Sequence, residues 1–239
     1  MQFISNNIKL KYNVNFEKDN HSYFIDNIIF PSITAIISYF NNTEIQYDKL
    51  MKNNELFKNA TERGKIIHEF ISRILYDAIF QTENRKDYKT IIKNSKKIST
   101  IKESLKIIEL FYNFFNRIKN DFIKSIIMFE IPLSDGKVCG TPDLIYYENN
   151  KAIVVDFKTW KYFNAEKINK AKIQITAYNY LLEKNNIFTS NIGEIWIINE
   201  NGVNINRFNI TNQLKLEWQE IMHTFLKNNS NKEKRNYEN

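Results

Sequence analysis

Apolar residues recur at helical spacing in two long stretches of the chain, at about residues 62–80 and 98–119. In both stretches they return every three or four positions, so they line one face of a helix. The two faces consist of Ile66, Ile67, Phe70, Ile71, Ile74, Leu75 and Ile79, and of Ile101, Leu105, Ile108, Phe111, Phe115 and Ile118. The same spacing predicts a helix at about 165–184, and Ser32 and Thr211 are suitable caps for two more.

Short apolar or alternating runs predict strands between these helices. The predicted strands lie at 8–14, 23–30, 126–133, 194–199 and 203–208. Asp26-Asn27 and Asp135-Gly136 are dipeptides that favour tight turns, and Glu130 is expected on the strand before the second turn. Residues 81–97 lack periodicity and are expected to form a loop or a weak helix. The polar end of the chain, 228–239, is expected to be frayed.

The segment 140–158 predicts a β-hairpin. It reads G-T-P-D-L-I-Y-Y-E-N-N-K-A-I-V-V-D-F-K, which is two apolar runs joined by a polar turn. Asp143 stands at the head of the first strand. Because side chains alternate along a strand, Asp156 and Lys158 point to one face at the end of the second strand, and Phe157 points to the other. The hairpin therefore brings two carboxylates and an ammonium group to one end of a sheet.

Asp143 and Asp156 predict a site for a divalent metal ion. Two close carboxylates repel each other unless a cation lies between them. A hard divalent ion with oxygen ligands is the simplest cation to expect. The ordinary alternative is that both residues are hairpin-end carboxylates without a ligand.

Composition narrows the class of protein. The chain has 239 residues, is 43% hydrophobic and contains only 5 glycines and 3 prolines, so we expect one packed domain spanning 1–239. Its formal net charge of +7 suits a polyanionic partner, although it would equally serve solubility. A single cysteine excludes a disulfide or a four-cysteine iron–sulfur cluster within the chain. No apolar run approaches ~20 residues and no signal-peptide pattern is present, so we expect an intracellular protein without a membrane span.

Four segments in this order resemble the PD-(D/E)XK nuclease superfamily, and within it the RecB-like exonucleases. They read R-G-K-I-I-H-E, G-T-P-D-L-I, V-V-D-F-K-T and Q-I-T-A-Y. The stretch H-S-Y-F-I-D-N-I-I-F-P-S-I-T also resembles the opening of phage-type members and of mitochondrial genome-maintenance exonucleases. The resemblance covers about residues 20–185, with a motif core at about 62–185. It implies an α/β fold with a central mixed β-sheet flanked by α-helices, the restriction-endonuclease-like core.

The resemblance also implies a metal site and catalytic roles. The expected metal ligands are His68, Asp143, Asp156, the backbone carbonyl of Phe157 and, directly or through water, Glu130. Mg²⁺ or Mn²⁺ is expected because most of these ligands are oxygen atoms. The expected catalytic residues are Asp143, Asp156, Lys158, Glu130, Gln174 and Tyr178. Lys158 would orient the attacking water and stabilise developing negative charge, while Gln174 and Tyr178 would position the strand or support Lys158.

Several of these residues also have ordinary structural explanations. His68 lies beside an apolar helix face and, taken alone, is a hydrogen-bonded histidine. Glu130 is then a solvated strand residue, and Gln174 and Tyr178 are the surface and core of one helix.

The segment after Lys158 supplies candidate contacts to nucleic acid. Trp160 and Tyr162 are expected to stack on unpaired bases, or else to close the core. Lys161, which lies between them, is expected to contact a phosphate.

We therefore expect a divalent-metal-dependent deoxyribonuclease, an exonuclease that acts on single-stranded DNA ends. The alternatives are a structure-specific endonuclease and a non-catalytic nucleic-acid-binding subunit of a recombination or replication complex. The complete set of acidic residues and lysine argues against the non-catalytic alternative.

Overall fold

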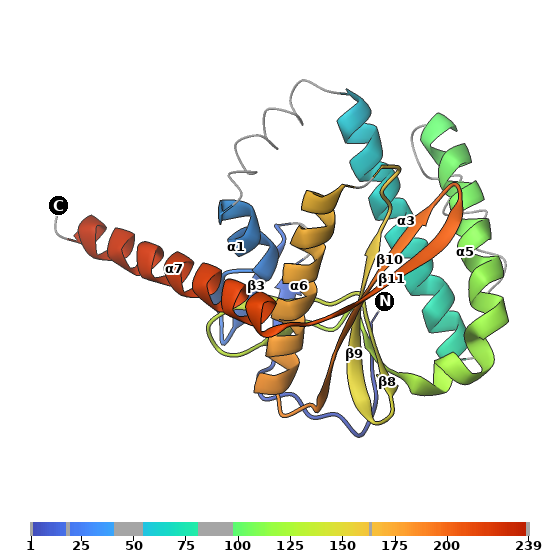
Figure 1. Cartoon of the computed structure of the whole chain (residues 1–239). Helices are drawn as coiled ribbons and strands as arrows, with labels where there is room; N and C mark the ends of the chain where they lie inside the picture. Colours follow the sequence, from blue (N-terminus) through green and yellow to red (C-terminus); the bar gives the residue numbers. More distant parts are fainter. Residues whose placement is uncertain (1, 18–19, 41–54, 81–97, 163, 238–239) are drawn as a thin grey trace.

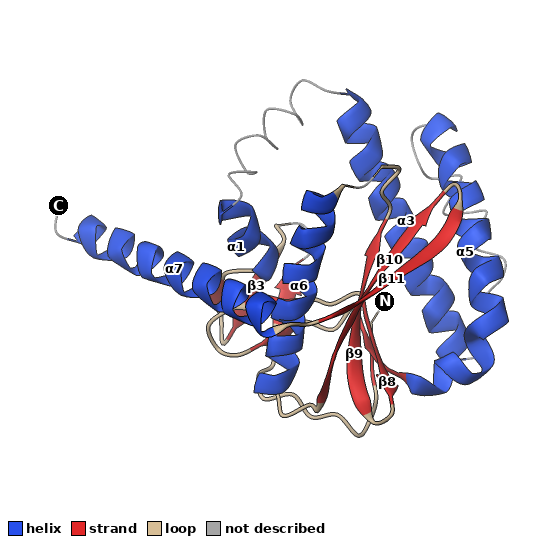
Figure 2. Cartoon of the chain, in the orientation of Figure 1, coloured by secondary structure: helices blue, strands red, loops and turns tan. Residues whose placement is uncertain are grey.

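A mixed sheet of six strands lies at the centre of the computed structural model, which describes residues 2–17, 20–40, 55–80, 98–162 and 164–237 (Figure 2). In spatial order the strands are β1 (Phe3–Ile4), β5 (Ile126–Phe129), β8 (Leu144–Glu148), β9 (Lys151–Lys158), β10 (Thr189–Asn199) and β11 (Gly202–Asn209). The pairing of β9 with β10 is parallel, and the other four pairings are antiparallel. The segment 81–97, predicted to be a loop or a weak helix, lies outside the described residues.

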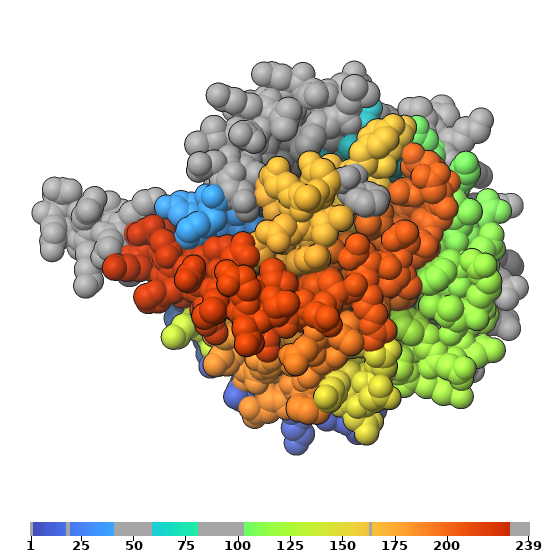
Figure 3. Space-filling view, in the orientation of Figure 1, coloured from blue at the N-terminus to red at the C-terminus, as the bar shows by residue number. Residues whose placement is uncertain are grey.

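Helices cover both faces of this sheet (Figure 1). One layer contains α3 (Glu55–Phe80) and α5 (Ile98–Ser125), and the other contains α1 (Ile33–Phe40), α6 (Ala165–Lys184) and α7 (Asn212–Tyr237). Each layer packs on its own cluster of buried apolar residues, and α7 lies against α6 on the surface of the second layer (Figure 3). The predicted α/β fold with a flanked mixed sheet is confirmed. None of the described helices is both long and apolar enough to cross a bilayer.

The alternation predicted for the central hairpin is present in β9. Val155 and Phe157 are buried beneath α3 and α5, whereas Val154 belongs to the cluster beneath α6. Asp156 and Lys158 continue the α6 side of the strand, and their charged groups lie 2.8 Å apart. A strand buried on both faces thus ends in two charged side chains.

Two small sheets complete the fold beside this end of β9. The first consists of β2 (Asn15–Glu17), β3 (Ser22–Ile25) and β4 (Ile28–Phe30), and the second of β6 (Leu133–Ser134) and β7 (Cys139–Gly140). The predicted turns are both present, with positive φ at Asp26, Asn27 and Gly136. The hydroxyl groups of Tyr23 and Thr141 lie 3.0 Å apart, which connects β3 to the segment that leads into β8.

Glycine allows α3 to approach the end of β9 closely. A Cβ atom on Gly64 would lie 3.2 Å from Thr159 Oγ1, which is tighter than ordinary packing. Because His68 follows Gly64 by about one turn, this approach also brings His68 towards the end of the sheet.

The predicted strand at 126–133 is wrong in its second half. The strand ends at Phe129, and Glu130 has a φ of 53°, a left-handed conformation that does not continue a strand. Glu130 is therefore on the connection after β5, where its backbone N–H donates to the carbonyl oxygen of Asp143 at 3.2 Å.

The predicted strand at 8–14 is absent. Its alternating apolar side chains pack against the rest of the protein, but its backbone does not pair with another strand. Ile8 and Leu10 pack on the α6-side cluster, whereas Val14 belongs to a separate cluster with Tyr23. At the other end of the chain, α7 continues to Tyr237 beyond the start of the predicted frayed tail. No glycine or proline follows Gly202 to end that helix.

Gly140→Ala should destabilise the fold by about 1–3 kcal/mol through overpacking. An added Cβ would lie 2.7 Å from Tyr178 Cε1 and 2.8 Å from Ile33 Cδ1, and both side chains are buried. Urea unfolding measures the loss, and Gly64→Ala is the comparison with a milder contact. Ile33→Val removes the Cδ1 atom, so the double variant should lose less stability than the sum of the two single losses. Losses that simply add would contradict a contact between the new Cβ and Ile33.

Candidate metal centre

Three potential metal ligands converge at the end of the central hairpin. His68 comes from α3, Glu130 from the connection after β5, and Asp143 from the residue before β8. One ligand atom from each lies within 4.8 Å of those of the other two. His68 Nδ1 is 3.6 Å from Asp143 Oδ1. Two carboxylates and an imidazole from three separate parts of the chain therefore form a group that could hold a metal ion.

Ser72 orients Glu130 within this group. Its hydroxyl donates to Glu130 Oε1 at 3.1 Å, and the serine is buried. Ser72 follows His68 by four residues, so both side chains lie on one face of α3. The sequence analysis did not identify Ser72, although this spacing from His68 was the available signal.

Asp156 lies beside the three-residue group and is bound differently. Its side chain is 4% exposed, and Oδ2 is 2.8 Å from Lys158 Nζ in an ion pair. Asp143 Oδ2, by contrast, accepts a hydrogen bond of 2.6 Å from the backbone N–H of Phe157. Asp156 is thus already paired with Lys158 and is not one of the three residues whose ligand atoms converge, so its role as a metal ligand stays a prediction. The role of the Phe157 carbonyl stays a prediction.

The charged groups shift one another's pKa values. Burial, with a further contribution from the Asp143 carboxylate, raises the pKa of Asp156 to about 6 despite the nearby Lys158. Burial alone would raise the pKa of Asp143 as well, but His68 and Lys158 hold it below its ordinary value. The pKa of His68 is raised because Asp143 outweighs the opposing effect of burial. The two carboxylates therefore differ: the pKa of Asp143 is lowered, whereas Lys158 and His68 only partly offset the effect of burial on the pKa of Asp156.

A short hydrogen-bonded chain holds Lys158. Its ammonium group donates to Gln174 Oε1 at 3.1 Å, and Gln174 Nε2 donates to the Tyr178 hydroxyl at 2.9 Å. Gln174 and Tyr178 share a face of α6, as their spacing predicted, and Tyr178 packs closely against Gly140. Lys158 thus lies between the carboxylate of Asp156 and the side-chain amide of Gln174, which is itself held by the Tyr178 hydroxyl.

The three residues predicted to contact nucleic acid differ in their exposure to solvent. Trp160 packs partly on the α6-side cluster, and its carbonyl accepts a hydrogen bond of 3.1 Å from Asn199. Tyr162 is 76% exposed, with Lys161 Nζ 5.9 Å from its ring centroid. Tyr162 and Lys161 are therefore available to a ligand, whereas Trp160 partly closes the core.

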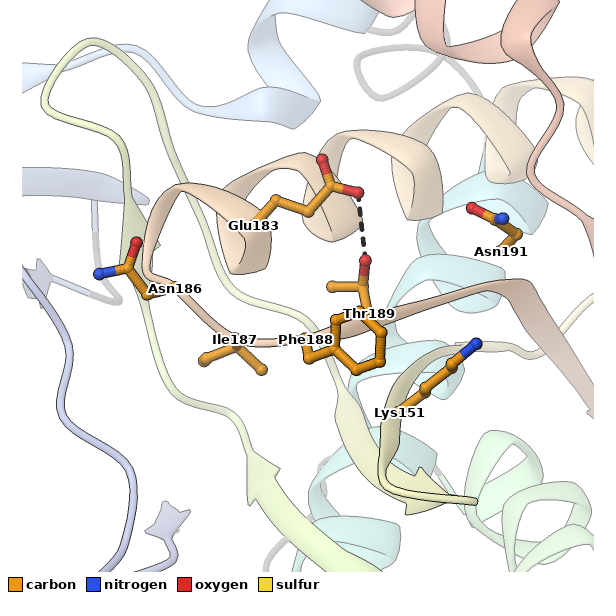
Figure 4. Close-up of a pocket in the computed structure, with 7 residues that line it drawn as sticks. All are labelled: Lys151, Glu183, Asn186, Ile187, Phe188, Thr189 and Asn191. Carbon is orange, nitrogen blue, oxygen red and sulfur yellow. Dashed lines mark hydrogen bonds between the residues drawn. The ribbon is translucent and has the colours of Figure 1, made fainter.

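A second hollow on the surface is not lined by a group of metal-ligating side chains. It has a volume of about 530 Å³ and lies at the start of β9, the opposite end of the strand from Asp156 (Figure 4). Its acidic residue, Glu183, accepts a hydrogen bond from Thr189. No histidine lines it, so the candidate site remains the group around Asp143.

Comparisons with known proteins leave the function open. No family model matches the chain, and no curated protein matches it. Among solved structures 21 chains match, including a crystal structure of SSO0001 with 16% sequence identity and a TM-score of 0.33. That match covers 64% of this chain and 74% of SSO0001. A likeness at this level carries no conclusion about activity.

His68→Ala should weaken Mn²⁺ binding more than it weakens the fold, because it removes one of the three ligands. Ser72→Ala should lower the affinity by about tenfold, since it frees Glu130 without removing a ligand. Isothermal calorimetry measures affinity, and urea unfolding measures stability. Ser125→Ala is the matched control, because its hydroxyl bonds only within its own helix region, to the carbonyl of Phe122. If both variants bind Mn²⁺ with the wild-type affinity, His68 and Ser72 have only a structural role.

Asp156→Asn should reduce the pH dependence of stability in the absence of divalent ions. The folded-state pKa of Asp156, about 6, exceeds its ordinary value of 3.8, so the fold favours the protonated form. That contribution to stability is complete below about pH 4 and is lost as the pH rises through about 6. Thermal unfolding from pH 4 to 7 should therefore show a smaller fall in Tm for the variant. Asp26→Asn, at an exposed turn, is the control. If Tm falls equally in wild type and Asp156→Asn, the raised pKa of Asp156 is contradicted.

Proposed function

We propose that the chain is a divalent-metal-dependent deoxyribonuclease that hydrolyses phosphodiester bonds. The observation that supports this best is the convergence of His68, Glu130 and Asp143 within 4.8 Å, next to the Asp156–Lys158 pair. A site with ligands for a cation and an adjacent fixed ammonium group suits a reaction in which an anionic phosphate is attacked.

Mg²⁺ or Mn²⁺ suits this donor set, which is mostly oxygen with one imidazole. His68, Glu130 and Asp143 would hold the ion, and Asp156, which is paired with Lys158, would complete the set. When bound, such an ion neutralises phosphate charge and lowers the pKa of a coordinated water.

Lys158 supplies the remaining positive charge of the site. Gln174 holds its ammonium group at 3.1 Å and Asp156 holds it at 2.8 Å, so its position is set before a substrate arrives. A preorganised cation of this kind can orient the attacking water by hydrogen bonding and stabilise the negative charge that develops on phosphate oxygens. Tyr178 contributes by positioning Gln174.

We further propose that the enzyme is an exonuclease that acts on single-stranded DNA ends. Tyr162 is 76% exposed just after the Lys158 strand, and Lys161 lies beside its ring. An exposed ring can stack on an unpaired base of any sequence, which contributes roughly 1–3 kcal/mol per base. Paired bases hide these faces.

Incubation of the purified chain with end-labelled single- and double-stranded DNA tests the activity itself. Cleavage should require Mg²⁺ or Mn²⁺ and stop in EDTA. Binding to DNA without cleavage under any of these ions would favour the non-catalytic alternative.

Lys158→Ala should lower kcat by about 10²–10³-fold while DNA binding persists, because the ammonium group acts mainly on charge that develops during the reaction. Lys124→Ala, an exposed lysine at the end of α5, is the charge-matched control. Circular dichroism confirms that each variant is folded. Near-wild-type turnover by Lys158→Ala would remove this residue from the mechanism.

Single-stranded linear DNA should be degraded faster than a relaxed, covalently closed duplex circle, which has neither an end nor exposed base faces. Gel electrophoresis of both substrates in one reaction gives the comparison. Tyr162→Ala should narrow the difference by weakening single-strand binding. Efficient nicking of the closed circle would instead identify an endonuclease.

A further inference from the structure

Two further hollows in the surface follow the segment that leads from β1 into β2. The first has a volume of about 540 Å³ and lies between residues 7–11 and the turn at 185–188. The second has a volume of about 550 Å³ and lies between residues 10–16 and Ile131. Leu10 lines both hollows, so they are neighbours, and we call the two together the N-terminal groove.

One end of the N-terminal groove adjoins the candidate metal centre. Ile131 and Pro132, which line the second hollow, directly follow the candidate ligand Glu130 in the chain. The other end reaches Phe188, whose carbonyl oxygen accepts a hydrogen bond of 2.8 Å from the backbone N–H of Ala152 near the start of β9. The groove therefore leads from beside the metal centre towards the opposite end of the central hairpin.

Hydrogen bonds hold the segment that lines the N-terminal groove. The backbone N–H of Ser5 donates to the carbonyl oxygen of Ile127 at 2.8 Å, and the backbone N–H of Lys11 donates to Asn185 Oδ1 at 2.9 Å. Asn185 is buried, and its side-chain amide donates in turn to the carbonyl oxygen of Ser134 at 2.8 Å. The segment is therefore fastened to the central sheet and to the end of α6.

The N-terminal groove carries positive charge without a carboxylate. Lys9 and Lys11 are exposed, and no aspartate or glutamate lines either hollow. Among the described residues, neither lysine forms an ion pair with an acidic group. The side-chain amides of Asn7, Asn13 and Asn15 also line the groove, and amides can donate hydrogen bonds to phosphate or base edges. This lining suits a polyanion.

Aromatic rings alternate with these polar groups. Phe188 is 67% exposed at one end of the groove, and Lys151 Nζ lies 5.3 Å from its ring centroid (Figure 4). Tyr147 lines the same hollow, and Tyr12 and Phe16 line the next one. Grooves that bind unpaired strands of any sequence combine positive charge, which follows the backbone, with rings on which bases stack.

We propose that the N-terminal groove binds the single-stranded part of the substrate beyond the bond that is cleaved. Lys9 and Lys11 contact its phosphates, and a base stacks on Phe188. The choice of DNA as the ligand rests on the proposed nuclease function.

Fluorescence anisotropy with a labelled single-stranded oligonucleotide in EDTA tests the charged part of this groove without cleavage. The double variant Lys9→Gln/Lys11→Gln should raise Kd several-fold. It should also reduce the slope of log Kd against log salt by about 1.4, twice the value of about 0.7 for one phosphate contact on a single strand. Lys106→Gln/Lys124→Gln, which changes two exposed lysines of α5, is the charge-matched control and should keep the wild-type slope.

The same assay tests stacking on Phe188. Phe188→Leu should raise Kd by about fivefold or more, because it removes the ring and keeps an apolar side chain. Phe188→Trp retains a ring and should bind within about twofold of wild type. With a blunt duplex, whose base faces are hidden, Phe188→Leu should bind as tightly as wild type. Tm values confirm that the variants are folded.

Equal losses of affinity in the two double-lysine variants, or a wild-type Kd in Phe188→Leu, would overturn the proposal. A Phe188→Leu loss of the same size with the blunt duplex would also overturn it, in favour of duplex binding.

The cleavage assay separates this inference from the proposed function. With Mg²⁺, Lys9→Gln/Lys11→Gln should raise KM several-fold and leave kcat within about twofold, since these lysines act on binding. Wild-type protein that binds DNA through the N-terminal groove but never cleaves it would refute the nuclease and preserve the groove. Cleavage with an unchanged KM in this variant would preserve the nuclease and refute the groove.

Discussion

Buried negative charge at the end of β9 is the constraint on which the site depends. Removing a carboxylate from water costs several kcal/mol unless hydrogen bonds and opposite charges replace the water. Asp143 obtains this compensation from the Phe157 N–H and from His68. For Asp156, the Lys158 ammonium and the nearby His68 only partly offset the effect of burial, so its pKa rises to about 6. A cation bound at the neighbouring His68, Glu130 and Asp143 would offset more of this cost.

The rest of the fold brings distant segments to this point. The α3 helix delivers His68 and Ser72, and it approaches the end of β9 because Gly64 has no side chain. The α6 helix delivers Gln174 to Lys158 from the opposite layer. The candidate metal site therefore lies at the end of the central strands, between the two helical layers, so a change in the packing of either layer would alter its geometry.

Much of this arrangement could be predicted from the sequence, because periodicity and turn residues are local signals. They correctly placed the central hairpin, the shared face of Gln174 and Tyr178, and the approximate positions of the long helices. They failed where tertiary contacts decide the backbone. Glu130 leaves the strand with positive φ, and its carboxylate is oriented by Ser72, 58 positions away in the chain. No periodic pattern records such a contact.

Crystals grown with Mn²⁺ would test the central claim most directly, through an anomalous difference map. The account predicts a peak at about 2.0–2.6 Å from ligand atoms of His68, Glu130 and Asp143, distances typical of bound divalent ions. Its height should fall in crystals of His68→Ala. A map without a peak at these residues, at an Mn²⁺ concentration that sustains DNA cleavage, would contradict the account.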